Sequence, residues 1–259
     1  MTSPTFVLVV GWLFVIFVTL AVPFAVLRSR DSLLVMARIP MRERYWVMMA
    51  PQLILGAIAA LTAFITGLEL FPSRMPSATA WLLGTAFLVC VVTLMRPSWR
   101  QTLEDPSPAW RLFTPVTGRE RWMWVTLAFA AGVCEELVWR GVLPSLAAAL
   151  TGSVPAAIAI SVFSFAVAHA IQGLRSVLAI ASIAAAFHAL VALSGSLYVA
   201  MAVHFVYDVI AGFTYARLAR QLGKLDPAAE SPSVPTEGER GIDPGGAPRG
   251  NETGDDRDA

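Results

Sequence analysis

The chain has 259 residues, of which 56% are hydrophobic and only 14% are charged. This composition lies well outside that of ordinary soluble proteins and is typical of a polytopic membrane protein. The formal net charge of +1 gives no electrostatic basis for nucleic-acid binding, so we expect no nucleic-acid partner.

Apolar windows long enough to cross a bilayer recur along the chain. They predict an all-α membrane bundle of about seven transmembrane helices. The windows are Thr5–Leu27, Tyr45–Leu68, Ser77–Met95, Trp122–Val142, Val154–Ile171, Leu174–Leu193 and Leu197–Leu218. Small residues crowd the later windows and permit close helix packing, so we expect the C-terminal helices to form the compact core.

Basic residues predict the orientation of the bundle. They fall almost entirely in loops on one side of the predicted membrane, and only Arg74 lies in a loop on the other side. We therefore expect a multi-pass protein of the cell membrane with its N-terminus outside and its C-terminal tail in the cytoplasm. Residues 97–121, rich in Pro, Trp and Arg, are expected to lie along the cytoplasmic interface as a loop and a short amphipathic helix.

These patterns divide the chain into three parts. Residues 1–121 carry accessory transmembrane helices and the interfacial segment, and residues 122–221 carry the core. Residues 222–259 are rich in Pro, Gly and charge without apolar periodicity, which predicts a disordered cytoplasmic tail.

Glu135, Glu136 and Arg140 lie inside the fourth apolar window. An ionised side chain near the bilayer centre costs about 2.5 to 3.5 kcal/mol on insertion scales, so a function or a partner must offset these three. Glu136 and Arg140 are four residues apart, with the acid first, and can form an ion pair on one helix face. Glu135 points about 100° away, and a purely structural pair does not explain it.

All three histidines lie in the last three windows, and His204 stands four residues before Asp208 on the same predicted helix face. A lone membrane histidine is more often a hydrogen-bonding link between helices, and this is how we interpret His188. A second imidazole, a third carboxylate and the glutamate pair on neighbouring helices favour catalysis or ion handling in a wet cavity for His169 and His204.

Three motifs stand in order on separate predicted helices: Glu135-Glu136 with Arg140, Phe165 with His169, and His204 with Asp208. In this order and spacing the chain resembles the CPBP family of CAAX prenyl proteases and bacteriocin-processing (Abi) intramembrane proteases. The resemblance extends over roughly Trp122 to Gly212, so the part 122–221 is interpreted as a CPBP-like protease core.

The resemblance implies an intramembrane endopeptidase that acts on a peptide or membrane-protein substrate next to lipid. It implies that Glu135 and His169 activate water and that His204 and Asp208 stabilise the oxyanion, with Glu136 in the site as the partner of Arg140. The physics of the site agrees, because Glu135 is held in a low-dielectric environment beside another carboxylate and is free to act as a base.

Asp208 departs from the family pattern, in which many members have Asn. An amide can donate a hydrogen bond to an oxyanion, whereas an ionised carboxylate cannot, so Asp208 favours metal binding more than Asn would. Glu135, His169, His204 and Asp208 together form a ligand set that suits zinc or another divalent cation. A metalloprotease and a metal-free, glutamate-dependent enzyme both remain open at this point.

Two other classes of protein remain open as well. A proton- or ion-coupled transporter also uses intramembrane acids and histidines, although the sequence shows no inverted repeat. A catalytically inactive scaffold of the same fold would bind a membrane partner instead. The substrate, any need for a prenyl group and the oligomeric state are not specified by the sequence.

The site residues are not all expected at the same depth in the membrane. The predicted boundaries place His169 near the cytoplasmic end of its helix, whereas Glu135 and His204 lie nearer the middle of the membrane. A cavity open to the cytoplasm would reconcile the two positions.

Overall fold

The structure, a computed structural model, describes residues 3–29, 36, 39–71, 74–104 and 114–225. Within these ranges all regular secondary structure is helical, which confirms the predicted all-α class. The α-helices are α1 (Pro4–Ile16), α2 (Val22–Arg28), α4 (Met41–Thr66), α5 (Ala78–Glu104), α7 (Gly118–Glu136), α8 (Leu143–Thr151), α9 (Val154–Ala168), α10 (Leu174–Ser194) and α11 (Leu197–Gln221). Two π-helical turns, η1 (Phe17–Ala21) and η3 (Leu137–Val142), and one 3₁₀ turn, η4 (Ala170–Gln172), join some of them.

Six of the predicted membrane helices are long and apolar enough to cross a bilayer, counted over the described residues. The helix predicted at Val154–Ile171 is shorter, because α9 ends at Ala168. The helix predicted to end at Val142 instead continues through η3 and α8 to Thr151. The tail 226–259, and residues 105–113 of the predicted interfacial segment, lie outside the described residues.

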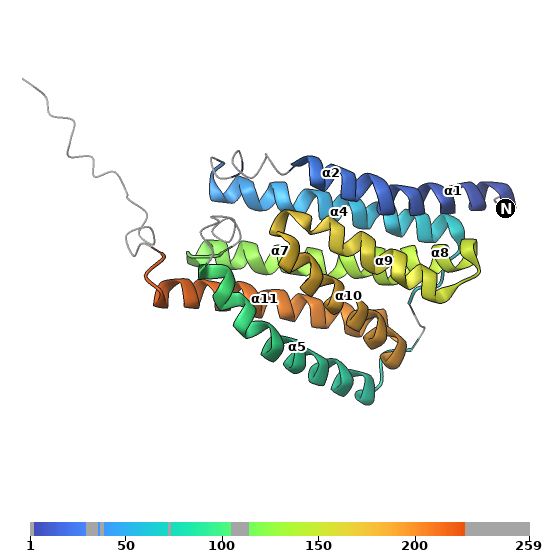
Figure 1. Ribbon diagram of the computed structural model, residues 1–259. Helices are drawn as coiled ribbons and strands as arrows, with labels where there is room; N and C mark the ends of the chain where they lie inside the picture. Colours follow the sequence, from blue (N-terminus) through green and yellow to red (C-terminus); the bar gives the residue numbers. More distant parts are fainter. Residues whose placement is uncertain (1–2, 30–35, 37–38, 72–73, 105–113, 226–259) are drawn as a thin grey trace, which may run out of the picture. The chain divides into compact units, whose positions relative to one another are not determined.

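Helix α7 lies in the middle of the bundle, with α4 packed on one side and α11 on another (Figure 1). It begins with a capping box, in which the Thr117 hydroxyl accepts from the Glu120 amide and the Glu120 carboxylate accepts from the Thr117 amide. Helix α5 packs against α10 and α11, and α9 packs against α8 and α10. The predicted core helices are thus in mutual contact around α7 and η3.

Glycines allow α7 to approach its two neighbours closely. A Cβ added at Gly132 would lie 2.8 Å from the Phe205 amide nitrogen and 3.1 Å from the Met201 carbonyl oxygen, both on α11. A Cβ added at Gly56 of α4 would lie 2.5 Å from Cys134 Sγ on α7. Glycine is therefore required where α7 meets the α11 backbone.

Both π-helical turns are followed by a proline. The Val22 amide bonds the Phe17 carbonyl and the Leu143 amide bonds the Val138 carbonyl, five residues back in each case. Val22 is followed by Pro23, and Leu143 by Pro144. A proline has no N–H and so cannot make the next backbone hydrogen bond of this series. The carbonyl five residues before each proline, that of Val18 and that of Trp139, therefore needs a partner from elsewhere.

Two serines of α9 supply these partners. The Ser164 hydroxyl donates to the Val18 carbonyl at 2.8 Å, and the Ser161 hydroxyl donates to the Trp139 carbonyl. The Trp139 indole N–H in turn donates to Ser164 Oγ at 3.2 Å. Both serines are fully buried, so α9 joins the two proline-interrupted helices through a satisfied polar network.

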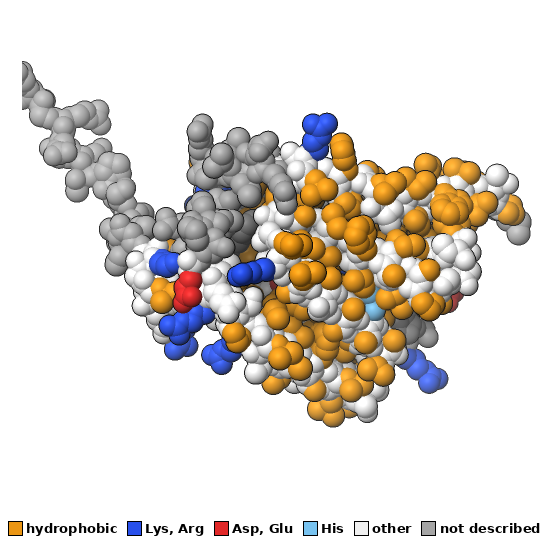
Figure 2. Space-filling model, viewed as in Figure 1, with side chains coloured by type: hydrophobic (Ala, Val, Ile, Leu, Met, Phe, Trp, Pro, Cys, Tyr) orange, Lys and Arg blue, Asp and Glu red, His pale blue; other side chains and the backbone are white. Residues whose placement is uncertain are grey.

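The outer surface of the bundle is apolar. Large hydrophobic side chains such as Phe64, Met75 and Leu193 are mostly exposed, and such side chains cover much of the face shown in Figure 2. Basic side chains gather at the end of the bundle where α11 ends (Figure 2). An apolar band with charge at its end is the surface of an integral, multi-pass membrane protein.

Candidate active site

The glutamate pair ends α7, directly before the π-helical turn η3. Both residues are buried: Glu135 is 4% exposed and Glu136 is 0% exposed. Since consecutive helix positions point about 100° apart, the two carboxylates enter different surroundings.

Glu136 has two partners. Its Oε1 lies 3.1 Å from Arg140 Nη1, which forms the ion pair that the sequence predicts. The same oxygen lies 2.8 Å from His204 Nδ1, a contact that the sequence does not predict. The Arg140 guanidinium also lies over the rings of Phe165 and Phe187, at 4.3 and 5.1 Å from their centroids. Aromatic faces help to stabilise a cation that has left water.

Glu135 has a different set of neighbours. Its Oε1 accepts a hydrogen bond from Gln52 Nε2 on α4 at 2.6 Å. Its Oε2 lies 3.9 Å from His204 Nε2, within ion-pair range but beyond a direct hydrogen bond. One carboxylate oxygen is therefore held by α4, while the other faces the imidazole of α11.

His204 stands between three carboxylates. Besides its contacts with the glutamates, its Nε2 lies 3.6 Å from Asp208 Oδ2. The Asp208 carbonyl accepts from the Trp124 indole N–H at 2.8 Å, which fixes this part of α11 against α7. The predicted His204–Asp208 pair on one helix face is thus present.

His169 follows the last residue of α9. Its Nδ1 lies 2.8 Å from the Phe165 carbonyl oxygen, and its ring packs on the Phe165 ring with centroids 4.5 Å apart. A carbonyl only accepts hydrogen bonds, so Nδ1 carries the proton and donates. In the neutral ring, Nε2 is then free to accept a hydrogen bond.

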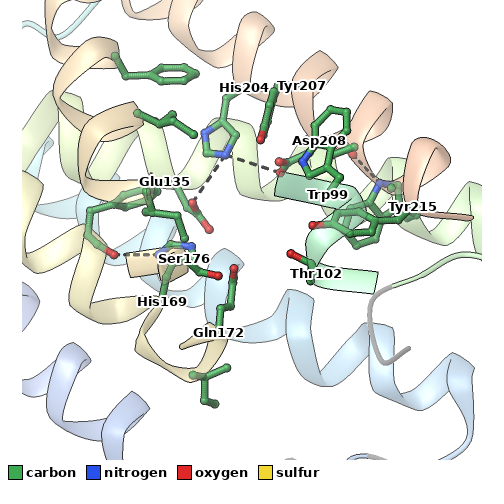
Figure 3. Close-up of a pocket in the computed structure, with 18 of the residues that line it drawn as sticks. Trp99, Thr102, Glu135, His169, Gln172, Ser176, His204, Tyr207, Asp208 and Tyr215 are labelled. Carbon is green, nitrogen blue, oxygen red and sulfur yellow. Dashed lines mark hydrogen bonds and ion pairs between the residues drawn. The ribbon is translucent and has the colours of Figure 1, made fainter. Parts of the chain in front are cut away.

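A cavity of about 340 Å³ lies between the helices that carry these residues. The four side chains Glu135, His169, His204 and Asp208 all line this cavity (Figure 3). Arg140 also lines the cavity. Glu136 does not line it and contacts the Nδ1 side of the His204 ring. Aromatic residues, among them Trp99, Trp124, Tyr207 and Tyr215, form much of the rest of the wall.

The short length of α9 accounts for the depth of His169. Its 15 residues span only about 22 Å, less than the roughly 30 Å apolar layer of a bilayer. The end of α9 therefore reaches the level of Glu135 and His204, with which His169 shares the cavity. In Figure 1 the turn from α9 to α10 stops short of the end of the bundle where α4 begins and α11 ends.

His188 lies outside the group that lines the cavity. Its Nε2 lies 3.2 Å from Ser161 Oγ, the hydroxyl that donates to the Trp139 carbonyl. His188 therefore donates to Ser161 and belongs to the polar network of α9.

The residues expected to bind a metal do not fit a divalent cation in this arrangement. Among the described residues, no group of three or more His, Cys, Asp and Glu side chains is placed to hold a metal ion. His204 Nδ1 donates to Glu136, so Nε2 is the nitrogen of this imidazole that could act as a ligand.

Gln52 is the site residue that sequence reasoning missed. It lies on α4, in the part expected to be accessory, and is 83 positions from its partner Glu135. The one signal in the sequence is that Gln52 is the single side-chain amide in the apolar window Tyr45–Leu68.

Together these features define a class of protein, a helical membrane protein with buried carboxylates and imidazoles around an internal cavity. Residues 117–210 match the model of a family described as type II CAAX prenyl endopeptidase Rce1-like. This match confirms the resemblance to the CPBP family over residues 117–210, and the three motifs all fall inside the matched range. No curated protein and no solved structure matches the chain.

Proposed function

We propose that the chain is a glutamate-dependent intramembrane endopeptidase that cleaves a peptide bond in a membrane-associated or lipidated substrate. One observation carries the proposal: a buried glutamate, Glu135, shares a cavity with His169 and His204 inside an apolar bundle. A base, a donor for the oxyanion and the exclusion of bulk water are the requirements of peptide hydrolysis.

Glu135 acts as the general base, and His169 helps to hold the water. The free Nε2 of His169 accepts one hydrogen of the water, while Glu135 Oε2 takes the other as the oxygen attacks the carbonyl carbon. The C–O bond forms and the carbonyl becomes an oxyanion. Glu135 then passes the proton to the leaving amine as the C–N bond breaks, which returns the carboxylate to its starting state.

His204 stabilises the oxyanion. Its Nδ1–H donates to Glu136, and its Nε2 faces Glu135 and Asp208, so a proton on Nε2 makes favourable contacts with both carboxylates. The distances of 3.9 and 3.6 Å leave Nε2–H without a close acceptor before the reaction. The developing oxyanion supplies that acceptor.

Asp208 supports the charge on His204 and does not itself donate to the oxyanion. Its carboxylate faces the imidazole at 3.6 Å, and its backbone is held by Trp124. This role resolves the departure from the family pattern, because an Asn side chain at the same position also offers an oxygen to Nε2–H.

The apolar and aromatic wall of the cavity suits a substrate with apolar side chains or a lipid chain. The matched family is named for prenylated CAAX substrates, which have this character. The end of the bundle rich in basic residues fits the cytoplasmic side of the cell membrane. We therefore propose that cleavage occurs near the cytoplasmic face, with the N-terminus outside.

The test is cleavage by the purified full-length protein in lipid nanodiscs, with a farnesylated CAAX peptide and its unprenylated copy as substrates. Mass spectrometry identifies the products. We expect Glu135→Gln to abolish cleavage, because the amide keeps the size of the side chain but cannot take a proton. Glu104→Gln is the control, because it makes the same change of charge at an exposed side chain. It should cleave at the wild-type rate.

Cleavage by Glu135→Gln at the wild-type rate would overturn the proposal and favour a transporter or a scaffold. Equal cleavage of both peptides would show that the prenyl group is not required, and would leave the endopeptidase assignment in place.

A further inference from the structure

Gln52 contacts the catalytic group from outside the region that matches the family. The matched range begins at residue 117, whereas Gln52 lies on α4. Its Nε2 lies 2.6 Å from Glu135 Oε1, the shortest separation between Glu135 and any of its partners described above. A short polar contact of this kind between distant parts of a chain, buried on the Glu135 side, restricts both side chains.

The close packing of α4 on α7 explains how Gln52 reaches Glu135. Gln52 and Gly56 are four residues apart and share one face of α4. Gly56 lies directly against Cys134, the residue before Glu135, with no room for a side chain between them. The amide one helical turn earlier is therefore held at the level of the carboxylate.

An amide has the chemistry to orient a base without neutralising it. Only the amino group of Gln52 can donate to a carboxylate, so the chemistry sets the orientation of the amide. It occupies Oε1 and brings no charge, whereas a lysine or arginine there would tie up the base in an ion pair. Oε2 is left for the proton of the attacking water, on the side of His204 (Figure 3).

We propose that Gln52 is a positioning residue of the protease, which holds Oε1 of Glu135 and thereby presents Oε2 to the water. This inference rests on the proposed function. It makes α4 part of the active site and not only accessory packing.

The first test is kinetic. Gln52→Met keeps the length of the side chain but removes the donor, so we expect kcat to fall roughly 10- to 100-fold with KM changed less than about twofold. The thermal midpoint should fall only modestly, because one hydrogen bond to the Glu135 carboxylate is lost while the methionine fits its apolar surroundings. Gln101→Met, an exposed glutamine of α5, is the matched control and should retain wild-type kcat.

Gln52→Asn is the second variant, in case the methionine variant does not fold. Its amide is one methylene too short to reach Oε1, so we expect the same loss of kcat at unchanged KM. A wild-type kcat in either folded variant would overturn the inference. A fall in kcat that is fully explained by a smaller fraction of folded protein would also overturn the inference, because it would show a role in folding alone.

An infrared measurement separates this inference from the proposed function. The carboxylate stretching band of Glu135 is the one lost in Glu135→Gln, and it should shift in Gln52→Met because a hydrogen bond to Oε1 is gone. If the wild-type protein cleaves no peptide but the band shifts, the proposed function fails and the contact stands. If the wild type cleaves and the band does not move, the positioning role fails alone.

Discussion

Glu136 is the residue on which the charges of the site depend. Its side chain and that of Arg140 are 0% and 1% exposed, and the same carboxylate oxygen also meets His204. Loss of one member of this group leaves another charge buried without a partner, which is far more costly than loss of an exposed ion pair.

We therefore expect Arg140→Ala to lower the free energy of unfolding by roughly 3 to 5 kcal/mol. Glu136→Gln should destabilise in the same direction and also lower activity, because the imidazole of His204 loses its anionic partner. Thermal unfolding in detergent, followed by intrinsic fluorescence, measures both. Arg100→Ala breaks an exposed pair of the same spacing on α5 and should cost no more than about 0.5 kcal/mol. Equal stability of Arg140→Ala and Arg100→Ala would contradict the burial of the pair.

Asp208→Asn tests whether the carboxylate supports His204 or binds a cation. We expect cleavage to be preserved or raised, since the Asn side chain offers both an oxygen to Nε2–H and an amide to the oxyanion. Asp208→Ala, which offers neither, should lose roughly 10-fold or more in kcat. Rates are measured with and without a chelator, which we expect to have no effect. Inhibition by the chelator, with recovery on addition of zinc, would show instead that the four side chains close on a metal.

Individual site residues were predictable where they form local patterns. Glu136 with Arg140 and His204 with Asp208 are pairs at helical spacing, and the structure contains both. Gln52 was not predictable in this way, because its partner lies on another helix and a single amide has no spacing to analyse. The contact between Glu136 and His204 escaped prediction for the same reason: it depends on how α7 faces α11.

At the scale of elements, α9 acts as a connector between proline-interrupted helices. Ser161 and Ser164 are three residues apart on one face, and each bonds a carbonyl left open by a proline of another helix. The apolar windows predicted the existence of these helices, because length and composition alone define a membrane span. They did not predict the π-helical turns, because one extra residue in a turn hardly changes the apolar pattern.

A double-mutant cycle tests this connector. Ser161→Ala leaves the Trp139 carbonyl and the His188 N–H unpaired and should cost about 1 to 3 kcal/mol of unfolding free energy. In the background Pro144→Ala, which restores a backbone N–H, the same serine substitution should cost less. Ser182→Ala is the control, since that hydroxyl bonds only its own helix. Identical costs in both backgrounds would show that Ser161 does not replace the N–H missing at Pro144.

At the scale of the whole molecule, the site depends on the distance between α7 and α11. The glutamates belong to one helix and His204 with Asp208 to the other, and Gly132 lies where the two backbones touch. Composition and motif order predicted that these helices form the core, but not the point of closest approach. The point of closest approach depends on which glycine of α7 faces the α11 backbone, and the sequence pattern does not specify this.

Gly132→Ala should therefore act on stability and activity together. The new Cβ would meet backbone atoms of α11, which cannot move aside as a side chain can, so we expect a loss of about 1 to 3 kcal/mol. Separation of Glu135 from His204 by even part of an ångström should lower kcat by roughly 10- to 100-fold. Gly118→Ala, where an added Cβ meets nothing within 4 Å, is the control for both assays. Full activity in Gly132→Ala would show that the helices need not pack so closely.

The π-helical turn after Glu136 also has a consequence for insertions and deletions. Such a turn holds one residue more than an α-helical turn, so deletion of any single residue from Leu137 to Val142 would let a regular α-helix form. Because the extra residue is taken up within the turn itself, the residues after it, from Leu143 to Thr151, would keep nearly the same faces relative to α7. Pro144, however, would now lie in a regular α-helical turn, where its ring clashes with the carbonyl four residues before it. The length of this turn is therefore under a stronger constraint than most of its side chains.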